Sequence, residues 1–123
     1  MKKFLVLFLI PIELLENWMK TDANERKIAE EKMKVAWDIW MQANAESFID
    51  TPAGAGKTKV VTQNGVADTK NNIMMYGTIK ANSQEEAASL FIGHPHLEIP
   101  EATIEITKIN PLKDLANNAG IVA

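Results

Sequence analysis

Two histidines that flank a proline, His94-Pro95-His96, are the residues of this sequence best suited to chemistry. An imidazole changes its charge near neutral pH, so a histidine can move protons or bind a metal ion. The same segment can also serve only to end a helix or to face the solvent. A metal site needs a third ligand, which folding would have to bring from Asp68, Glu98 or Glu105, because none follows at a local spacing. We expect no metal here and no organic cofactor.

A second segment that can do chemistry is Asp68-Thr69-Lys70, although it also fits a solvated turn. A carboxylate beside an imidazole raises the imidazole pKa and fixes its tautomer, so Asp68 or Glu105 can orient a histidine. Lys70 opposes that protonation and can attract an anionic ligand. The candidate catalytic residues are therefore His94, His96 and Asp68. The candidate ligand-binding residues are Lys70, Tyr76, Glu105 and Trp37, and Trp37 fits plain core or a dimer interface as well.

The elements that must position these residues begin with four predicted strands. The first segment is apolar throughout residues 4–10 and is followed by Pro11, which is typical of a strand buried on both faces. The second is β-branched and alternating, and Asn64-Gly65 after it is a strong tight-turn signal. The last two alternate as half-buried strands. The strands are predicted at residues 3–10, 57–63, 73–81 and 102–109.

Two main helices are predicted, at residues 24–45 and 84–93, after a short helical pattern over 12–20. The long one has an apolar arc of about 240°, whereas a helix lying on one sheet needs only a little over 100°. Its excess apolar surface indicates a further contact, most simply with a second subunit. The short helix opens with a capping box from Ser83 to Glu86, and Gly93 is placed to end it.

The order β-α-β-β-α-β predicts an α+β fold, the ferredoxin-like plan with an antiparallel sheet. Both helices cover one face of that sheet, so the other face stays bare unless a second copy covers it. Two bare faces stacked in a homodimer would enclose a partly apolar cavity suited to a small molecule. The short helix runs back toward the start of the third strand, where Asp68 and Lys70 enter. We therefore expect His94 and His96 beside them, near the wall of this inter-sheet cavity.

Length and composition limit the possible functions. The chain has 123 residues, 46% of them hydrophobic, which is typical of one globular domain. We place that domain at residues 1–112 and an irregular tail at 113–123. The net charge is −3 and neither half of the chain is basic, so no nucleic acid partner is expected. The absence of cysteine excludes disulfides, thiol nucleophiles and cysteine zinc sites.

Two segments imitate other signals. Lys2-Lys3 and the apolar run after it resemble a secretory signal, but no small residues mark a cleavage site, and the run is too short to span a bilayer. We therefore expect a strand in a cytoplasmic protein with no membrane partner. Residues 51–58 resemble a phosphate-binding loop, yet Thr51 stands where that motif needs glycine and a strand pattern follows where it needs a helix.

The segment from Asn64 to Lys70 resembles the Asp-Gly-Pro-Phe and Glu-Thr-Lys signature of the YCII-related (YciI-like, DGPF-type) proteins. The strand after it, the Ser-capped helix, the His-Pro segment and the Ile-Glu-Ile strand ending near Asn110-Pro111 follow in the family's order. The resemblance covers residues 57–112, and residues 1–45 only as a pattern. It implies a dimeric α+β barrel. Val66-Ala67 replaces Pro-Phe, and the histidine of the family's long helix is absent near residues 35–37.

Two functions follow as expectations. The first is a cofactor-free acid–base enzyme of YCII-related type acting on a small organic molecule in the inter-sheet cavity. There, His94 or His96 moves protons and Asp68 or Glu105 orients the imidazole. The second is a non-catalytic dimer that binds or senses a small molecule in the same cavity. A strongly perturbed pKa in a closed pocket favours the enzyme.

Overall fold

The computed structural model of the protein describes residues 1–111. The predicted tail, 113–123, and the last residue of the predicted domain lie outside these described residues. The sheets contain β1 (Lys2–Leu9), β2 (Ala53–Gly54), β3 (Thr58–Thr62), β4 (Gly65–Thr69), β5 (Ile73–Ala81) and β6 (Thr103–Lys108). The helices are α1 (Ile12–Met19), α2 (Ala23–Asn44) and α3 (Gln84–Ser89), with short 3-10 turns η1 (Ala45–Ser47) and η2 (Pro95–Glu98).

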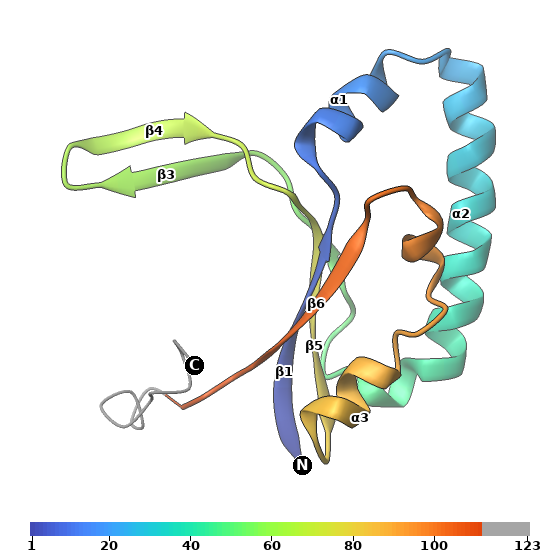
Figure 1. Ribbon diagram of the computed structural model, residues 1–123, viewed down its shortest axis with the longest axis vertical. Helices are drawn as coiled ribbons and strands as arrows, with labels where there is room; N and C mark the ends of the chain where they lie inside the picture. The colour runs from blue at the N-terminus through green and yellow to red at the C-terminus, as the bar shows by residue number, and fades with distance from the viewer. Residues whose placement is uncertain (112–123) are drawn as a thin grey trace.

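The main sheet has four strands in the order β2-β5-β1-β6, and every neighbouring pair is antiparallel. The predicted strands at 3–10, 73–81 and 102–109 are confirmed as β1, β5 and β6. Figure 1 shows α2, α3 and η2 on one side of this sheet and the β3–β4 hairpin projecting from the other side. The protein is thus an α+β fold with antiparallel sheets, broadly compatible with a ferredoxin-like plan.

The predicted second strand, 57–63, forms but does not belong to the main sheet. It is β3, which pairs with β4 in a separate two-stranded sheet, and the short β2 takes the edge of the main sheet. The predicted turn at Asn64-Gly65 is confirmed, with Gly65 at φ 121°. Because the turn folds the chain straight back, residues 65–69 form a strand, β4, which was not among the predicted strands. Alternation predicts a strand, but it cannot say which strand is its partner.

The helices follow their local capping signals. Asp22 caps α2, since its carboxylate accepts hydrogen bonds from the backbone N–H groups of Asn24 and Glu25. Ser83 caps α3 as predicted, while the Glu86 carboxylate accepts from the N–H of Asn82. The predicted helix at 84–93 ends early, at Ser89, and turns follow it up to Gly93 at φ 78°. Over residues 1–111, no helix combines the length and apolarity that crossing a membrane requires.

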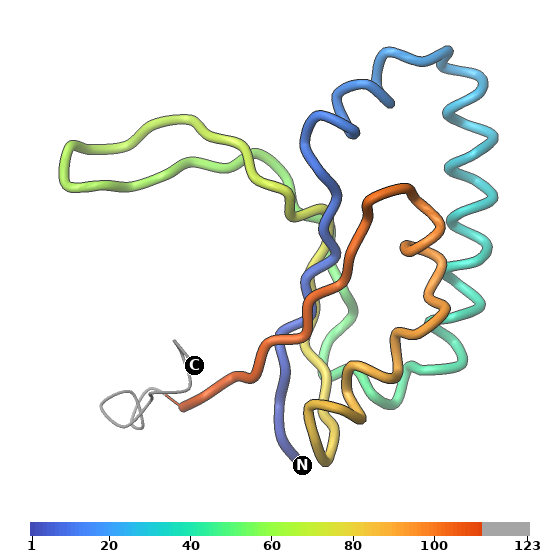
Figure 2. Tube along the Cα trace, in the orientation of Figure 1, coloured from blue at the N-terminus to red at the C-terminus, as the bar shows by residue number. Residues whose placement is uncertain are grey.

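The core lies between the main sheet and the helices on its covered face. Phe4, Val6 and Phe8 of β1 alternate inward and are fully buried, together with Ile79 of β5. Figure 2 follows the chain after α3 as it runs back between the sheet and α2, where η2 packs against α2. The expected inward residues of β6, Ile104 and Ile106, pack against this core, which confirms their assignment.

The opposite face of the sheet has no cover from the described residues. Leu5, Leu7 and Leu9 of β1 alternate toward this face and are only half-buried. The β3–β4 hairpin beyond it contains no buried side chain, and its cross-strand pair Val61 and Val66 is exposed. A two-stranded ribbon without packing is marginally stable in water. Both features leave apolar side chains of this side of the molecule accessible to solvent.

The core assignment predicts a large stability loss on truncating Phe8, whose ring contacts Trp37, Phe91 and both imidazoles. Phe8→Ala should lower the free energy of unfolding by about 3–5 kcal/mol because it leaves a cavity that the sheet cannot close. Val61→Ala, at a side chain 75% exposed, is the control and should cost less than about 1 kcal/mol. Urea denaturation measures both. Equal losses in the two variants would contradict this description of the core.

Candidate functional site

Both histidines are buried in the core and do not face a cavity between sheets. His94 is 1% exposed and His96 is 0% exposed. The His94 ring lies 4.4 Å from the rings of both Trp37 and Trp40, centre to centre, and 5.3 Å from that of Phe8. The His96 ring meets the Phe8 ring edge-on at 5.6 Å. Aromatic rings of α2 and β1 thus enclose the pair.

The backbone fixes the tautomers of the two imidazoles. His94 Nδ1 accepts a hydrogen bond from the His96 backbone N–H at 3.0 Å, so neutral His94 carries its proton on Nε2. His96 Nε2 lies 2.9 Å from the carbonyl oxygen of Leu9 and donates to it, because a carbonyl only accepts. The two remaining ring nitrogens, His94 Nε2 and His96 Nδ1, are buried without a hydrogen-bond partner among residues 1–111.

Burial makes both imidazoles poor bases. Burial, and to a smaller extent repulsion from a charge on the neighbouring His96, lowers the pKa of His94 to about 4. Burial also lowers the pKa of His96, although the hydrogen bond to the Leu9 carbonyl and the nearby backbone of Thr103 oppose the effect. At neutral pH the pair is therefore uncharged.

The structure does not bring the expected partners to these histidines. Asp68 is on the β3–β4 hairpin, where its carboxylate pairs with Lys59 at 2.6 Å. Lys70 pairs with Glu16 of α1 at 2.9 Å, which holds the pKa of that carboxyl below its usual value. Glu105 is exposed on β6. Neither Asp68 nor Glu105 can orient an imidazole in this arrangement, so we correct our expectation that Asp68, Lys70 and the histidines are neighbours.

Tyr76 lies on the uncovered face of the sheet. It is 47% exposed and lines a small pocket of about 330 Å³ with Leu5, Leu7 and Ile73, beside the loop at 55–58. This pocket is the part of the uncovered face that most resembles the predicted inter-sheet cavity. Neither histidine lines it.

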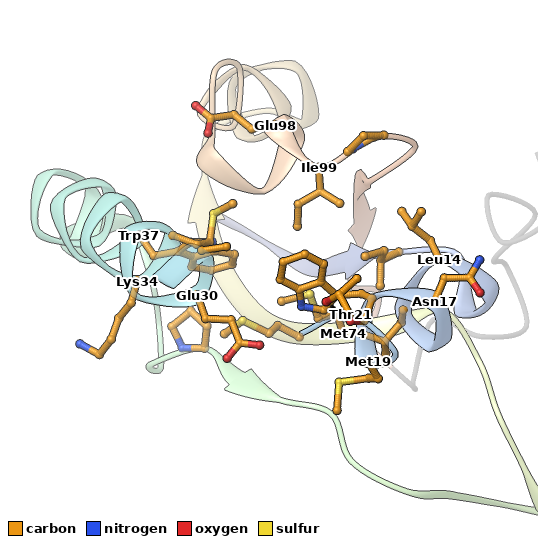
Figure 3. A pocket seen from close by; sticks show the side chains of 18 of the residues that line it. Leu14, Asn17, Met19, Thr21, Glu30, Lys34, Trp37, Met74, Glu98 and Ile99 are labelled. Atoms are coloured by element: carbon orange, nitrogen blue, oxygen red, sulfur yellow. Dashed lines mark hydrogen bonds between the residues drawn. The ribbon is translucent and has the colours of Figure 1, made fainter. Parts of the chain in front are cut away.

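Trp37 does line a cavity, but on the covered side of the sheet. A pocket of about 1090 Å³, here called the helix–sheet pocket, lies between α1, α2, the ends of β1 and β5, and the segment after η2. Figure 3 shows Trp37 and Ile99 facing this cavity from opposite elements. Its apolar lining is Ile10, Leu14, Leu15, Trp18, Met19, Ala29, Met33, Trp37, Met41, Pro52, Met74, Met75, Ile99 and Pro100.

The charged groups of the pocket stay at its rim. Lys34 and Asp38 neutralise each other across 2.8 Å on the exposed side of α2. In Figure 3 the Lys34 and Glu98 side chains point away from the cavity. Glu30 and Glu98 are both exposed to solvent, where their charges are screened. The interior can therefore accept an apolar molecule without burying a protein charge.

Five of the six methionines line this pocket: Met19, Met33, Met41, Met74 and Met75. Methionine is flexible and polarizable, and proteins use it on surfaces that adapt to different apolar partners. The sequence predictions missed these residues because each methionine, taken alone, fits a core position. Their number in a chain of 123 residues was the available signal, together with Trp18 in a helix that turns out to have no buried residue.

No protein-family model matches this chain, and no curated protein matches it significantly. Among residues 1–111, no group of three potential ligands is close enough to hold a metal ion. The proposed function therefore rests on the geometry of the two pockets and of the histidine pair.

The depressed pKa of His94 predicts a loss of stability in acid. The unfolded chain takes up a proton below pH 6.5, whereas folded His94 resists protonation down to about pH 4. The contribution of neutral His94 to the free energy of unfolding is then fully present above pH 6.5. The free energy of unfolding falls by about 3 kcal/mol as the pH drops to about 4. Urea denaturation at a series of pH values measures this slope.

His94→Phe is the matched variant, since a phenyl ring suits the aromatic surroundings and cannot titrate. It should flatten the stability profile in this pH range. A wild-type profile that is already flat between about pH 7 and about pH 4 would show that His94 is not held neutral.

Proposed function

We propose that this protein binds a largely apolar small molecule in the helix–sheet pocket. The observation that carries the proposal is the pocket's size, about 1090 Å³, with a lining rich in tryptophan and methionine. Binding sites for small molecules are mostly apolar, with a few polar groups that orient the ligand. Asn17, Thr21 and Thr51 supply such groups among the lining residues.

Binding is favoured over acid–base catalysis by the place of the histidines. Neither imidazole lines the helix–sheet pocket or the smaller pocket at Tyr76. Each imidazole directs one ring nitrogen to the backbone, through the His96 N–H and the Leu9 carbonyl. A general base must reach the proton that it removes, directly or through one water. The non-catalytic alternative is thus the better supported of the two expected functions, with its cavity moved to the covered side of the sheet.

Membership in the YCII-related family is part of the proposal. It is supported by the order of elements and by the hairpin whose turn carries the signature-like segment from Asn64 to Lys70. The Asp68–Lys59 and Lys70–Glu16 ion pairs give that segment a structural role in this chain.

We also propose a homodimer formed through the uncovered face of the sheet. The half-buried Leu5, Leu7 and Leu9 form an apolar row along the central strand, and the hairpin beside them has unpacked valines. A second copy would remove these groups from water. A stable interface of this kind buries about 1,600 Å² in total.

Ligand binding is testable with N-phenyl-1-naphthylamine, a neutral apolar dye whose fluorescence rises in apolar surroundings. Ala29→Trp places an indole in the pocket lining and should weaken dye binding at least about tenfold, because one filled pocket cannot hold both rings. Ala43→Trp is the control, on the same helix but outside the lining. Fluorescence titration compares the three proteins. Unchanged binding in Ala29→Trp would place the dye elsewhere.

The homodimer is testable by light scattering, which should report twice 13.7 kDa at micromolar concentration. Leu7→Glu puts a charge in the centre of the uncovered face and should yield a folded monomer, since an unpaired charge cannot be buried in an interface. Ile92→Glu, at a side chain 80% exposed on the covered side, should remain dimeric. A wild-type monomer at these concentrations would refute the dimer.

A further inference from the structure

We propose that the His94–His96 pair makes the helix–sheet pocket sensitive to acid: protonation of the pair releases η2 from α2, and the pocket loses a wall and its ligand. This inference rests on the proposed function, because it describes how that site is regulated.

Three stretches of the pocket wall depend directly on the pair. Trp37 lines the pocket and also contacts His94, ring centre to ring centre, at 4.4 Å. Ile10 lines it one residue after Leu9, whose carbonyl holds His96. Ile99 lines it one residue after η2, the turn that contains His96. Any movement of the two imidazoles is therefore transmitted to α2, to β1 and to the segment after η2.

Within the described part of the chain, residues 1–111, no counter-ion faces a protonated pair. From β1 the groups that face it are the Phe8 ring and the Leu9 carbonyl, and from α2 they are the Trp37 and Trp40 rings. The segment after α3 adds the Phe91 ring, and β6 adds the backbone of Thr103. The only titratable group among all of these is the other imidazole.

The charged side chains of the same elements lie at the surface. Lys34 and Asp38 of α2 lie next to Trp37. They form an ion pair with each other. Glu98 of η2 and Glu105 of β6 are exposed. A positive charge on His94 would thus be buried among aromatic rings beside a second imidazole, and water outside η2 offers the nearest strong solvation.

We expect the release of η2 to leave the rest of the sheet folded. The pair lies in and beside η2 and contacts the end of β1 and the middle of α2, whereas Phe4, Val6 and Ile79 belong to the buried core further along the sheet. η2 is a single four-residue turn, and α1 on the far side of the pocket has no buried residue. Segments with so little burial open at a lower free energy than the central strands.

The pKa of the buried His94 determines in which direction a change of pH shifts the equilibrium between the closed and the open form. The closed form holds His94 neutral down to about pH 4, while an imidazole released to water titrates near pH 6.5. Acid between these values therefore favours the open form, by at most about tenfold per pH unit for one proton. Conversely, a bound ligand should lower the pH at which the pair takes up protons.

The experiment measures the affinity for N-phenyl-1-naphthylamine from about pH 8 to about pH 4, a range in which the dye stays neutral and His titrates. Circular dichroism reports helix content, and NMR follows the two imidazoles, which are the only histidines of the chain. The affinity should fall below about pH 6.5, at its steepest about tenfold per pH unit, while helix content is retained. The His94→Phe/His96→Gln variant should keep its affinity, since neither side chain titrates and the amide can still donate to the Leu9 carbonyl.

Two results would overturn the inference. One is protonation of the imidazoles by NMR with no loss of dye affinity, and the other is loss of affinity only in step with loss of helix content. If the variant does not fold, the imidazole titrations of the wild type with and without dye decide instead. Dye must shift both titrations to lower pH, and an unchanged titration counts against the inference.

Failure of the proposed function has a different signature, namely no dye binding even at about pH 8. The inference then stands or falls on the protein without dye. Acid should expose Trp37 to acrylamide quenching, with helix content retained, if the pair releases η2. Quenching that stays constant down to about pH 4 would refute the release of η2 independently of any ligand.

Discussion

Two neutral imidazoles buried among aromatic rings are the constraint on which the rest of this structure depends. His94 and His96 satisfy one ring nitrogen each through the backbone, by way of the His96 N–H and the Leu9 carbonyl. The second of these contacts connects the turn η2 to the end of β1. Trp37 and Trp40 pack edge-on against His94 and connect the same turn to α2. Three elements distant in sequence are thereby held around one uncharged pair, whose other two ring nitrogens are buried without a hydrogen-bond partner among residues 1–111.

The helix–sheet pocket follows from this arrangement. The pair holds α2 and the segment after η2 against the sheet near the end of β1, and α1 passes over that end without burying a residue of its own. The space that remains is lined by flexible methionines and by Trp18 and Trp37, with charges kept at the rim. The opposite face of the sheet remains uncovered, so the two sides of one sheet have different roles in our proposals, ligand binding on one and self-association on the other.

Local signals in the sequence predicted most of the elements, because caps and turns involve residues within a few positions of each other. Ser83 and Asn64-Gly65 act where the sequence predicted them, and Asp22 caps α2 through an equally local contact. The hairpin was assigned to the wrong sheet because β3 pairs with β4, and alternation carries no information on strand partners. Asp68 was misplaced as a consequence, since its position depends on that pairing.

The candidate site was harder to predict because it depends on contacts between distant segments. His96 and Leu9 are 87 positions apart, and Lys70 and Glu16 are 54 apart. Histidine is a polar residue, so we expected the two histidines in the wall of a pocket. Their burial is made possible by backbone groups, and these cannot be recognised in a sequence because nearly every residue carries them. Trp37 was singled out for its aromatic character as a candidate in the inter-sheet cavity, and it lines a cavity on the other side of the sheet.

The central claim is that the helix–sheet pocket is the binding site, and the most direct test is a crystal structure with a bromine-substituted N-phenyl-1-naphthylamine. Anomalous scattering locates the bromine independently of the protein atoms. Our account predicts a bromine peak inside the pocket, between Trp37 and Ile99 and against the methionines. A peak beside Tyr76 on the uncovered face, or no peak in the pocket while the dye is bound, would contradict it.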